Sequence, residues 1–423
     1  MEKGKSPYKV GFFGLFGQQN WGNECSLQAM IYNIRKHHPG LEIYCVCTYP
    51  EDTSARYGIP AIPMVSISPT RNVWWGQNNQ FIRLLRKVFY FIPKELLHWI
   101  KVYRTLWGSQ MLIAPGTGLL TDFHGNIYGR CYEIFKLSII AKLCRCKVMF
   151  VSIGAGPIRH PVSRWFIKSA LSMADYRSYR NDSSRQYLEG IGFKAKYDAI
   201  YPDLAFSLPR SMMPECNKHD KQKLVIGVGV ADSIVGIMDY NGKDKLQKRH
   251  ETIYKEYIDK ICSFVIWLLD NKYTVRILTG DTIYDSMPKE ELKNQLKRRG
   301  YDYNDGNILD EPITSVENLI SQLASTDVVV SPRFHNIILA LMLNKPIISL
   351  SYHNKFSSLM TELELEEYCQ DTKDLNIEKL KELFTKLMKN VESIKQHIKL
   401  KTEENRLALE RQYLFIFNKM KYR

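Results

Sequence analysis

Apolar runs of strand length alternate with segments of helical period along most of the chain. Residues 8–14 (YKVGFFG) and 41–47 (LEIYCVC) are such runs, and between them apolar residues recur at the i, i+3, i+4, i+7 spacing of one helix face. After residue 222 the pattern starts again, with strand-like runs at 224–230, 274–280, 327–333 and 346–352. Such alternation is typical of α/β proteins with mostly parallel sheets. The sequence therefore predicts two α/β halves.

The two halves meet at residues 209–222 (PRSMMPECNKHDKQ), where prolines stand among polar and charged residues, as in a linker. The remaining expected elements of the first half are strands at 111–114, 147–153 and 176–179 and helices at 162–173 and 183–189. With 423 residues the chain is long enough for two domains. We expect an N-terminal domain over 1–208, a linker over 209–222, a C-terminal domain over 223–372 and a helical tail over 373–423.

The charge of the chain favours an anionic partner, because 59 Lys and Arg face 44 Asp and Glu and give a formal charge of +15. Nucleic acid, an anionic membrane surface and a negatively charged small molecule all fit that charge. The chain shows no sequence signature of a nucleic-acid-binding module, so we expect no nucleic-acid partner. The nine cysteines include two C-x-C pairs but no C-x-x-C, which favours buried thiols over a zinc site.

The hydropathy pattern predicts no membrane-spanning segment, because no run reaches about 18 uninterrupted apolar residues. The first residues lead directly into an apolar strand, without the long apolar stretch and cleavage site of a secretory signal. We therefore expect a cytoplasmic protein.

Residues from about 71 to 107 form an insertion in the first domain in which aromatic and basic side chains are mixed. They include Trp74, Trp75, Trp99 and Trp107 together with Arg83, Arg86, Lys87, Lys94, Lys101 and Arg104. A segment of this kind can lie in a membrane interface, where cations meet anionic headgroups. That hypothesis places the protein peripherally at the inner face of the cytoplasmic membrane. The alternative is a helical insertion that packs on the first domain and keeps its basic face in water.

The main candidate site follows the strand-like run 327–330, where the sequence continues as Ser331-Pro332-Arg333-Phe334-His335-Asn336. Open α/β sheets bind ligands at the carboxyl ends of their strands. In extended backbone, Arg333 and His335 point to the same side. They would place a guanidinium that can grip an anion beside an imidazole that titrates near neutrality. A structural Arg/His pair at a helix start is the alternative.

A second basic element follows the next strand, where the sequence PIISLSYHNK places Lys355 just beyond the strand end. Neighbouring strand ends would bring Lys355 near Arg333. We expect Lys345, in an Asn-Lys-Pro turn, to be an ordinary solvated lysine.

Three glycine-containing loops follow strands of the first domain. The first carries Asn20, Gly22, Asn23 and Glu24. Its glycines allow close approach of the backbone, Asn20 and Asn23 can cap the helix that follows, and the N-terminus of that helix can receive a ligand. The other two are 115–118, with Gly116 and Gly118, and 154–157. None has the spacing of a nucleotide-binding fingerprint. Tight turns explain each glycine by itself, but three such loops together favour a ligand site.

At these residues the chain resembles the polysaccharide pyruvyl transferase family, over roughly residues 11–368. The most specific match is SPRFHNIILALMLNKPIISLSYHNK, which looks like the family pattern S-x-R-x-H, apolar helix, small turn and P-x-I-x-L-S-Y-x-x-K. Other landmarks agree: N-x-G-x-E at 20–24, a glycine turn at 116–118, I-G-x-G-P at 153–157, R-N-D-x-S at 180–184 and D-x-A-F at 203–206. The family usually has Asp where this chain has Asn23, and Gly where it has Thr117.

The resemblance implies two Rossmann-like domains that face each other across a cleft, as in GT-B glycosyltransferases. It also implies transfer of a pyruvyl group from phosphoenolpyruvate to a sugar of a polysaccharide precursor as a cyclic ketal. His335 is then the catalytic acid/base, and Arg333, Lys355 and Arg180 bind phosphoenolpyruvate. The acceptor residues are Asn20, Gly22, Asn23, Glu24, Gly116 and Gly118. Neither a metal nor a cofactor is expected.

Two rival functions remain. The first is a glycosyltransferase that uses a sugar nucleotide, because the implied scaffold hosts both reactions. The second is a non-catalytic, membrane-associated protein of polysaccharide assembly, which the departures at Asn23 and Thr117 favour. A lipid-linked oligosaccharide acceptor would reconcile a cytoplasmic enzyme with a basic surface.

Overall fold

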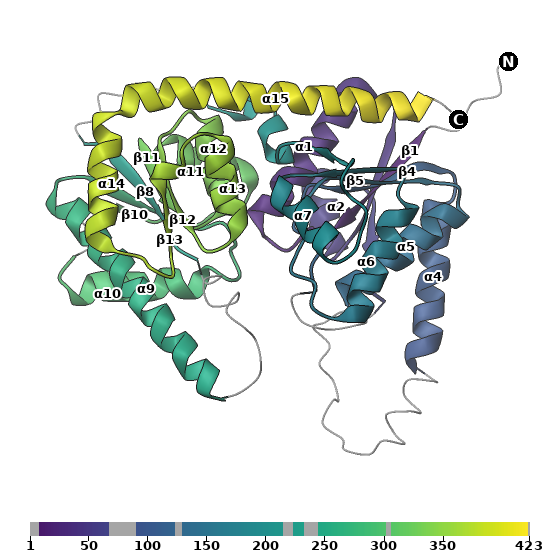
Figure 1. Ribbon diagram of the computed structural model, residues 1–423, viewed down its shortest axis with the longest axis horizontal. Coiled ribbons are helices and arrows are strands. Elements are labelled where there is room, and N and C mark those ends of the chain that lie inside the picture. The colour runs from purple at the N-terminus through teal and green to yellow at the C-terminus, as the bar shows by residue number, and fades with distance from the viewer. Residues whose placement is uncertain are drawn as a thin grey trace. The chain divides into compact units, whose positions relative to one another are not determined.

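The computed structural model describes residues 8–66, 90–122, 129–214, 223–231, 244–301 and 306–421 (Figure 1). Its contacts divide the chain into two compact units. Unit 1 comprises Met1–Gln18, Ser26–Asp203 and Gln412–Arg423, and unit 2 comprises Gln19–Cys25 and Leu204–Arg411. Two helices therefore contribute residues to both units: α1 (Trp21–His37) and α15 (Val391–Lys421).

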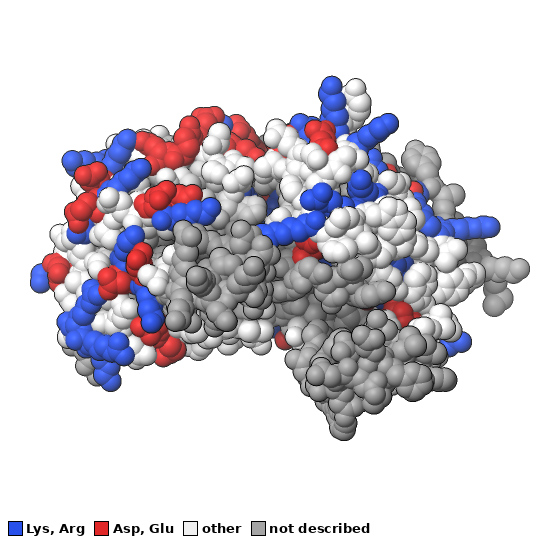
Figure 2. Space-filling model, turned by 60° about the horizontal axis from the view of Figure 1, so that its bottom comes forward, with Lys and Arg blue, Asp and Glu red and all other residues white. Residues whose placement is uncertain are grey.

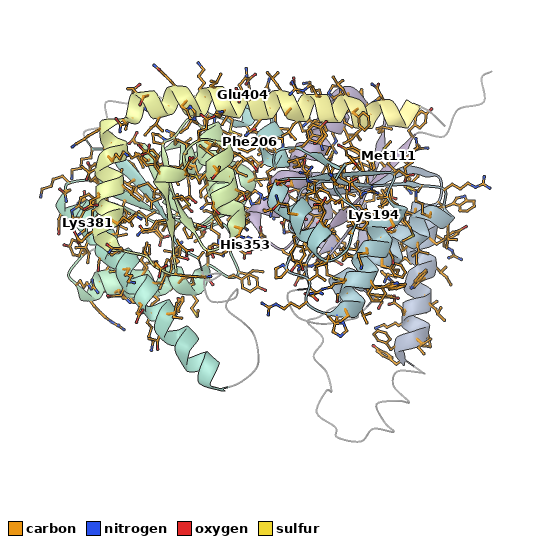
Figure 3. The ribbon with its side chains drawn as sticks, in the orientation of Figure 1. Met111, Lys194, Phe206, His353, Lys381 and Glu404 are labelled. Atoms are coloured by element: carbon orange, nitrogen blue, oxygen red, sulfur yellow. The ribbon has the colours of Figure 1, made fainter. Side chains whose placement is uncertain are left out.

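Unit 1 is built on a parallel sheet with the strand order β3-β2-β1-β4-β5-β6-β7. Its strands are β1 (Lys9–Gly14), β2 (Glu42–Cys47), β3 (Ala61–Pro63), β4 (Ser109–Pro115), β5 (Lys147–Ile153), β6 (Tyr176–Tyr179) and β7 (Ala199–Ile200). Because helices cover both faces, the central strands are buried almost throughout. Met111 of β4, labelled in Figure 3, is fully buried. Phe13 meets Phe150 edge to face at 5.8 Å.

The helices of unit 1 lie in two layers. They are α1 with α2 (Pro50–Tyr57), α4 (Ile92–Leu106), α5 (Arg130–Leu143), α6 (Pro161–Met173) and α7 (Asp182–Gly190). Helices α4, α5 and α6 lie side by side on one face of the sheet, and α1 covers the other (Figure 1). The last residues of α15 pack on the α1 side, where Phe417 contacts His37 and His38.

Unit 2 holds a second parallel sheet, with the strand order β10-β9-β8-β11-β12-β13. The strands are β8 (Val225–Gly229), β9 (Thr274–Leu278), β10 (Ile308–Leu309), β11 (Val328–Ser331), β12 (Ile347–Ser351) and β13 (Cys369–Asp371). The helices are α9 (Asp244–Asp270), α10 (Ser286–Arg298), α11 (Val316–Ala324), α12 (Phe334–Met342), α13 (Asn354–Glu362), α14 (Ile377–Lys389) and most of α15. Among the described residues, 3₁₀ helices lie at Leu204–Ser207, Arg210–Met212 and Glu366–Tyr368.

The predicted α/β class, the two parallel sheets and the helical C-terminal region are confirmed. Strands 147–153 and 176–179 have the predicted bounds. One local prediction is wrong: Lys345 is 4% exposed, because its ammonium donates to the carbonyl of Ala324 at 2.9 Å. None of the eight described cysteines forms a disulfide.

The predicted aromatic and basic insertion is covered in part. Trp74, Trp75, Arg83, Arg86 and Lys87 lie outside the described residues. Residues Ile92–Leu106 of the segment form α4, which packs against the core of unit 1 through Val102 and Leu106. Across the described ranges, no helix is both long enough and apolar enough to pass through a bilayer.

Candidate functional site

The candidate residues of unit 2 lie where its central strands end. β11 and β12 are adjacent parallel strands, so the residues that follow Ser331 and Ser351 emerge at the same edge of the sheet. Arg333 and His335 follow β11, and Lys355 follows β12. The expected grouping of these three side chains at neighbouring strand ends is therefore present in unit 2.

Arg333 stands at the start of α12, and its guanidinium is held by Asp285. Its Nε donates to Oδ2 of Asp285 at 2.9 Å, and Nη2 donates to Oδ1 of the same carboxylate. Asp285 is fully buried. Because the helix begins at Phe334, the backbone from Arg333 to His335 is not extended, and the predicted same-side geometry does not apply.

The pair with Asp285 fixes the protonation state of Arg333. Burial by itself would lower the pKa of Arg333, but the charge of Asp285 raises it above its ordinary value. Arg333 is thus a permanent cation that cannot act as an acid or base. In the described part of the chain Nη1 makes no hydrogen bond, so one edge of the guanidinium is held and the other can meet an anion.

Asp285 belongs to a loop between β9 and α10 whose role the sequence analysis missed. Its Oδ2 also accepts hydrogen bonds from the backbone N–H groups of Gly280 and Asp281, at 2.9 and 3.0 Å. Asp281 is 4% exposed and accepts from the backbone of Ile283 and Tyr284. Burial raises the pKa of Asp281 above its usual range. The sequence signal that could have pointed to this loop is the pair of carboxylates, Asp281 and Asp285, four residues apart just after β9.

His335 packs directly on the first turn of α1. A Cβ atom added to Gly22 would lie 1.9 Å from Nδ1 of the His335 ring, so any larger residue at this position must displace the imidazole. The ring also meets that of Phe334, with ring centroids 5.5 Å apart and planes nearly perpendicular. The imidazole is therefore in contact with both a backbone segment and an aromatic ring.

The first glycine-containing loop joins unit 2 through hydrogen bonds to the β9–α10 loop. Asn20 donates through Nδ2 to Asp281 at 2.8 Å, and the backbone N–H of Trp21 donates to the carbonyl of Gly280 at 3.1 Å. Asn20 also caps α1, because its Oδ1 accepts from the backbone of Asn23 at 3.3 Å, which confirms the predicted cap at Asn20, whereas Asn23 lies inside the helix. Glu24 is fully buried and Asn23 is half-buried. Gly22 thus lies beside His335, and Asn20 beside the Asp285 loop.

Lys355 lies in the first turn of α13, among aromatic rings. Its ammonium is 5.3 Å from the ring centroid of Phe334, 5.7 Å from that of Tyr352 and 5.2 Å from that of Phe356. Aromatic faces attract a cation without neutralising its charge. His353, labelled in Figure 3, caps the helix by accepting from the backbone N–H of Lys355 at 3.2 Å.

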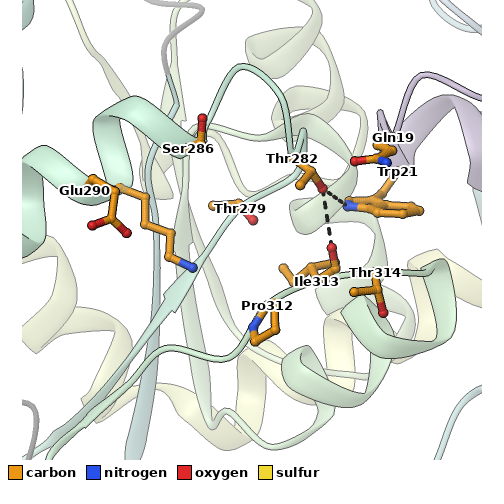
Figure 4. Close-up of a pocket in the computed structure, with 10 residues that line it drawn as sticks. Gln19, Trp21, Thr279, Thr282, Ser286, Glu290, Pro312, Ile313 and Thr314 are labelled. Carbon is orange, nitrogen blue, oxygen red and sulfur yellow. Dashed lines mark hydrogen bonds between the residues drawn. The ribbon is translucent and has the colours of Figure 1, made fainter.

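A cavity of about 260 Å³ opens beside the β9–α10 loop. Trp21 donates through its indole N–H to Oγ1 of Thr282 at 3.0 Å, and Thr282 donates to the carbonyl of Ile313 at 3.4 Å (Figure 4). The lining consists of Gln19, Trp21, Thr279, Thr282, Ser286, Lys289, Glu290, Pro312, Ile313 and Thr314. Lys289 pairs with Asp310, which also pairs with Lys293.

The other predicted site residues belong to unit 1. Arg180 follows β6 and pairs with Asp203, Nη1 to Oδ2, at 3.3 Å, and both side chains are buried. A Cβ on Gly154 would lie 2.7 Å from the guanidinium, and one on Gly118 would lie 3.8 Å from it. Gly116 donates its N–H to the carbonyl of Val151 at 2.8 Å, and the Gly154 N–H donates to the carbonyl of Thr117, a residue that is 1% exposed.

Among the described residues, no three His, Cys, Asp or Glu side chains converge so that they could hold a metal ion. The expectation that neither a metal nor a cofactor is needed stays a prediction.

The fold has many relatives among solved structures. A glycosyltransferase from Rickettsia africae superimposes with a TM-score of 0.57 at 12% identity, covering 99% of this chain and 100% of that one. The UDP-GlcNAc 2-epimerase of Neisseria meningitidis bound to UDP-GlcNAc gives 0.55 at 10% identity, covering 99% and 100%. HepE from Anabaena, in complex with UDP and glucose, gives 0.57 at 11%, covering 98% and 100%. At these identities the likeness defines the class, a GT-B-like α/β protein.

The family is defined by the sequence. The family model of polysaccharide pyruvyl transferases matches residues 20–354, which include the Asn20–Glu24 loop, Arg180, Arg333 and His335. The chain belongs to the polysaccharide pyruvyl transferase family, and the predicted resemblance is confirmed. No curated protein sequence matches the chain.

Proposed function

We propose that the protein transfers a pyruvyl group from phosphoenolpyruvate to a sugar of a lipid-linked polysaccharide precursor and closes it as a cyclic ketal. The observation that carries the proposal is the grouping of Arg333, His335 and Lys355 at the ends of two adjacent strands of unit 2. Membership of the family supplies the pyruvyl transfer and the glycan acceptor.

The electrostatics of the site suit a donor that carries a carboxylate and a phosphate. Asp285 cancels the charge of Arg333. Arg333 can therefore orient a bound anion through hydrogen bonds from its outer edge, but it adds little net positive charge to the site. Lys355 and the N-termini of α12 and α13 add a cation and positive helix potential at this edge of the sheet. Arg333, the residue before α12, makes no side-chain cap to this helix.

His335 is the proposed acid/base. A sugar hydroxyl forms a bond from its oxygen to C2 of phosphoenolpyruvate, while C3 gains a proton and becomes a methyl group. His335 delivers or removes one of the two protons that move in this step. A second hydroxyl of the same sugar then bonds to C2, the C2–O bond to phosphate breaks, and inorganic phosphate leaves with the remaining proton.

The acceptor is proposed to approach His335 along the Asn20–Glu24 loop, because Gly22 already lies against the imidazole. Gly116 and Gly118 are proposed as acceptor contacts from unit 1, and Arg180 as a further donor contact. Its pairing with Asp203 parallels that of Arg333 with Asp285, since each arginine follows a strand and is held by a buried carboxylate. A lipid-linked acceptor implies work at the inner face of the cytoplasmic membrane.

The test is turnover by the purified full chain with phosphoenolpyruvate and a lipid-linked oligosaccharide, followed by phosphate release and by mass spectrometry of the glycan. We expect His335→Ala to lower turnover at least about 100-fold and Arg333→Lys to be severely impaired. We expect Lys355→Met to raise KM for the donor, whereas Lys373→Met, which alters an exposed lysine of the same unit, changes nothing.

Two results would overturn the proposal. Turnover near the wild-type level in folded His335→Ala would remove the catalytic assignment. Stabilisation of the protein by UDP- or GDP-sugars but not by phosphoenolpyruvate would favour the glycosyltransferase alternative, since a ligand of the native state raises Tm.

A further inference from the structure

Helix α4 presents large apolar side chains to solvent along its outer face. Ile92, Leu96 and Ile100 follow one another at intervals of four residues and are 49%, 59% and 48% exposed. Leu97 beside them is 66% exposed, and Trp107, just past the helix, is 63% exposed. At 1.5 Å per residue the stripe from Ile92 to Trp107 is about 22 Å long. A surface helix of a globular protein ordinarily turns its polar side outward.

The inner face of α4 carries paired polar groups besides the apolar Val102 and Leu106. Glu95 accepts from the buried ammonium of Lys136 on α5 at 2.8 Å and from the hydroxyl of Tyr132 at 2.9 Å. His98, 6% exposed, contacts the same ammonium through Nδ1 at 3.1 Å and the carbonyl of Pro63 through Nε2 at 2.9 Å. These directional bonds fix the rotation of the helix about its axis. The apolar stripe therefore cannot turn inward without breaking them.

The charged side chains on the outer face of α4 are positive. Lys101 and Arg104 are exposed beside the stripe, and Lys94 is half-buried against Tyr90. Glu95, the acidic residue of this helix, points inward. The outer face thus combines apolar and cationic groups and has no carboxylate of its own.

The charge of the whole chain is concentrated in the unit that carries α4. By sequence, unit 1 has 29 Lys and Arg against 12 Asp and Glu, whereas unit 2 has 30 against 32. Figure 2 agrees, since blue and red mix over the left part, unit 2, while blue predominates over red on the part of unit 1 that is visible at the right. The excess of +15 is therefore a property of unit 1.

We infer that the outer face of α4 is the surface by which the protein binds an anionic lipid bilayer. The stripe of Ile92, Leu96, Leu97 and Ile100 enters the boundary between headgroups and acyl chains. Lys101 and Arg104 reach the anionic headgroups, and Trp107 lies at the interfacial depth that tryptophan favours. The inference deepens the proposed membrane location. Vesicle binding needs neither donor nor acceptor, so its failure and the failure of the proposed reaction are distinguishable.

The test is sedimentation of the full chain with vesicles of phosphatidylcholine with and without phosphatidylglycerol. We expect binding that requires phosphatidylglycerol and weakens as salt rises. Leu96→Ser/Leu97→Ser/Ile100→Ser is expected to weaken binding at least about tenfold, because apolar burial is lost. Lys101→Glu/Arg104→Glu is expected to weaken it on anionic vesicles. The matched control is Leu400→Ser, an equally exposed leucine on α15 of unit 2, and it should bind as the wild type does.

Three outcomes would overturn the inference. The first is no sedimentation with anionic vesicles at low salt. The second is wild-type binding by a folded triple variant. The third is a lipid-free dimer in sedimentation velocity that the same triple variant abolishes, because it would assign the stripe to a second copy of the chain.

Discussion

The imidazole of His335 lies directly against the backbone of Gly22, so that a single added methyl group would come within 1.9 Å of Nδ1. Gly22 stands in the first turn of α1, in the loop that binds Asp281 through Asn20. Asp281 and Asp285 both belong to the β9–α10 loop, and Asp285 holds Arg333. The β9–α10 loop thus holds the proposed anion-binding group directly, and it binds the segment that contacts the proposed acid/base.

This contact predicts the effect of Gly22→Ala. The new methyl group must displace the His335 ring, which is the movable end of a side chain, so the backbone can stay in place. We expect the free energy of unfolding to change by no more than about 1 kcal/mol, since alanine also favours the helix. Turnover should fall about 100-fold, because misplacement of a catalytic group by about 1 Å is that costly. Gly40→Ala, where nothing lies within 4 Å, is the control in both measurements. Unchanged turnover in Gly22→Ala would contradict the role of this contact.

The buried pair of Arg333 and Asp285 predicts two linked effects of Asp285→Asn. The variant should be less stable than the wild type, and phosphoenolpyruvate should stabilise it more. Asp285→Asn leaves a buried guanidinium without its counter-charge, which costs about 3–5 kcal/mol in the free energy of unfolding. A bound anion would then replace the lost charge. We expect phosphoenolpyruvate to raise the Tm of Asp285→Asn by more than it raises the Tm of the wild type.

The partly exposed pair of Arg56 and Asp52 offers a control for the same chemical change. Asp52→Asn is expected to cost less than about 1 kcal/mol, because water screens this pair. Equal Tm shifts by phosphoenolpyruvate in Asp285→Asn and the wild type would show that the ligand does not reach Arg333. Denaturant titrations and thermal scans supply both quantities.

How much of this was accessible from the sequence depends on the distance over which each contact forms. Periodicity located strands such as 147–153, and a short contiguous motif located Arg333, His335 and Lys355. Asp285 was missed because it lies 48 residues before its partner, and no local pattern reports such a pairing. The burial of Lys345 depends on a carbonyl 21 residues away and was missed for the same reason.

The buried cluster under α4 predicts a pH effect on stability. Burial raises the pKa of Glu133 to about 7, despite an ion pair with Lys136 at 2.5 Å. The folded state therefore holds this proton more tightly than the unfolded state does. Stability from this group is present below the unfolded pKa of Glu, about 4.3, and is lost as pH rises to about 7. Burial and the charge of Lys136 lower the pKa of His98, which acts in the opposite sense as pH falls.

The comparison with Glu133→Gln isolates the contribution of Glu133, because His98 and Glu95 are present in both proteins. We expect the free energy of unfolding of the wild type, relative to the variant, to fall by up to about 3 kcal/mol between pH 4.5 and 7. Above pH 7 the difference should stay level. A difference that is the same at all these pH values would show that Glu133 titrates alike in the folded and unfolded states.

The end of α15 predicts that unit 1 depends on the last residues of the chain. Gln412 is fully buried, accepts from the hydroxyl of Ser152 at 3.2 Å and donates to that of Ser178 at 2.7 Å. Tyr413 and Phe417 are also buried, and their rings stack at 5.8 Å. A chain that ends at Arg411 loses this packing, at about 1.5–3 kcal/mol for each large apolar side chain.

A chain that ends at Asn418 keeps these contacts and is the matched control. We expect hydrogen exchange in β5 and β6 to accelerate strongly in the shorter chain, while β9 and β11 of unit 2 keep their protection. Gln412→Leu should reproduce part of the effect, about 1–3 kcal/mol, because it leaves buried serine hydroxyls without their partner. Equal protection of β5 in the two truncated chains would show that unit 1 is stable without residues 412–418, and that the helix end is an accessory to the sheet rather than part of its core.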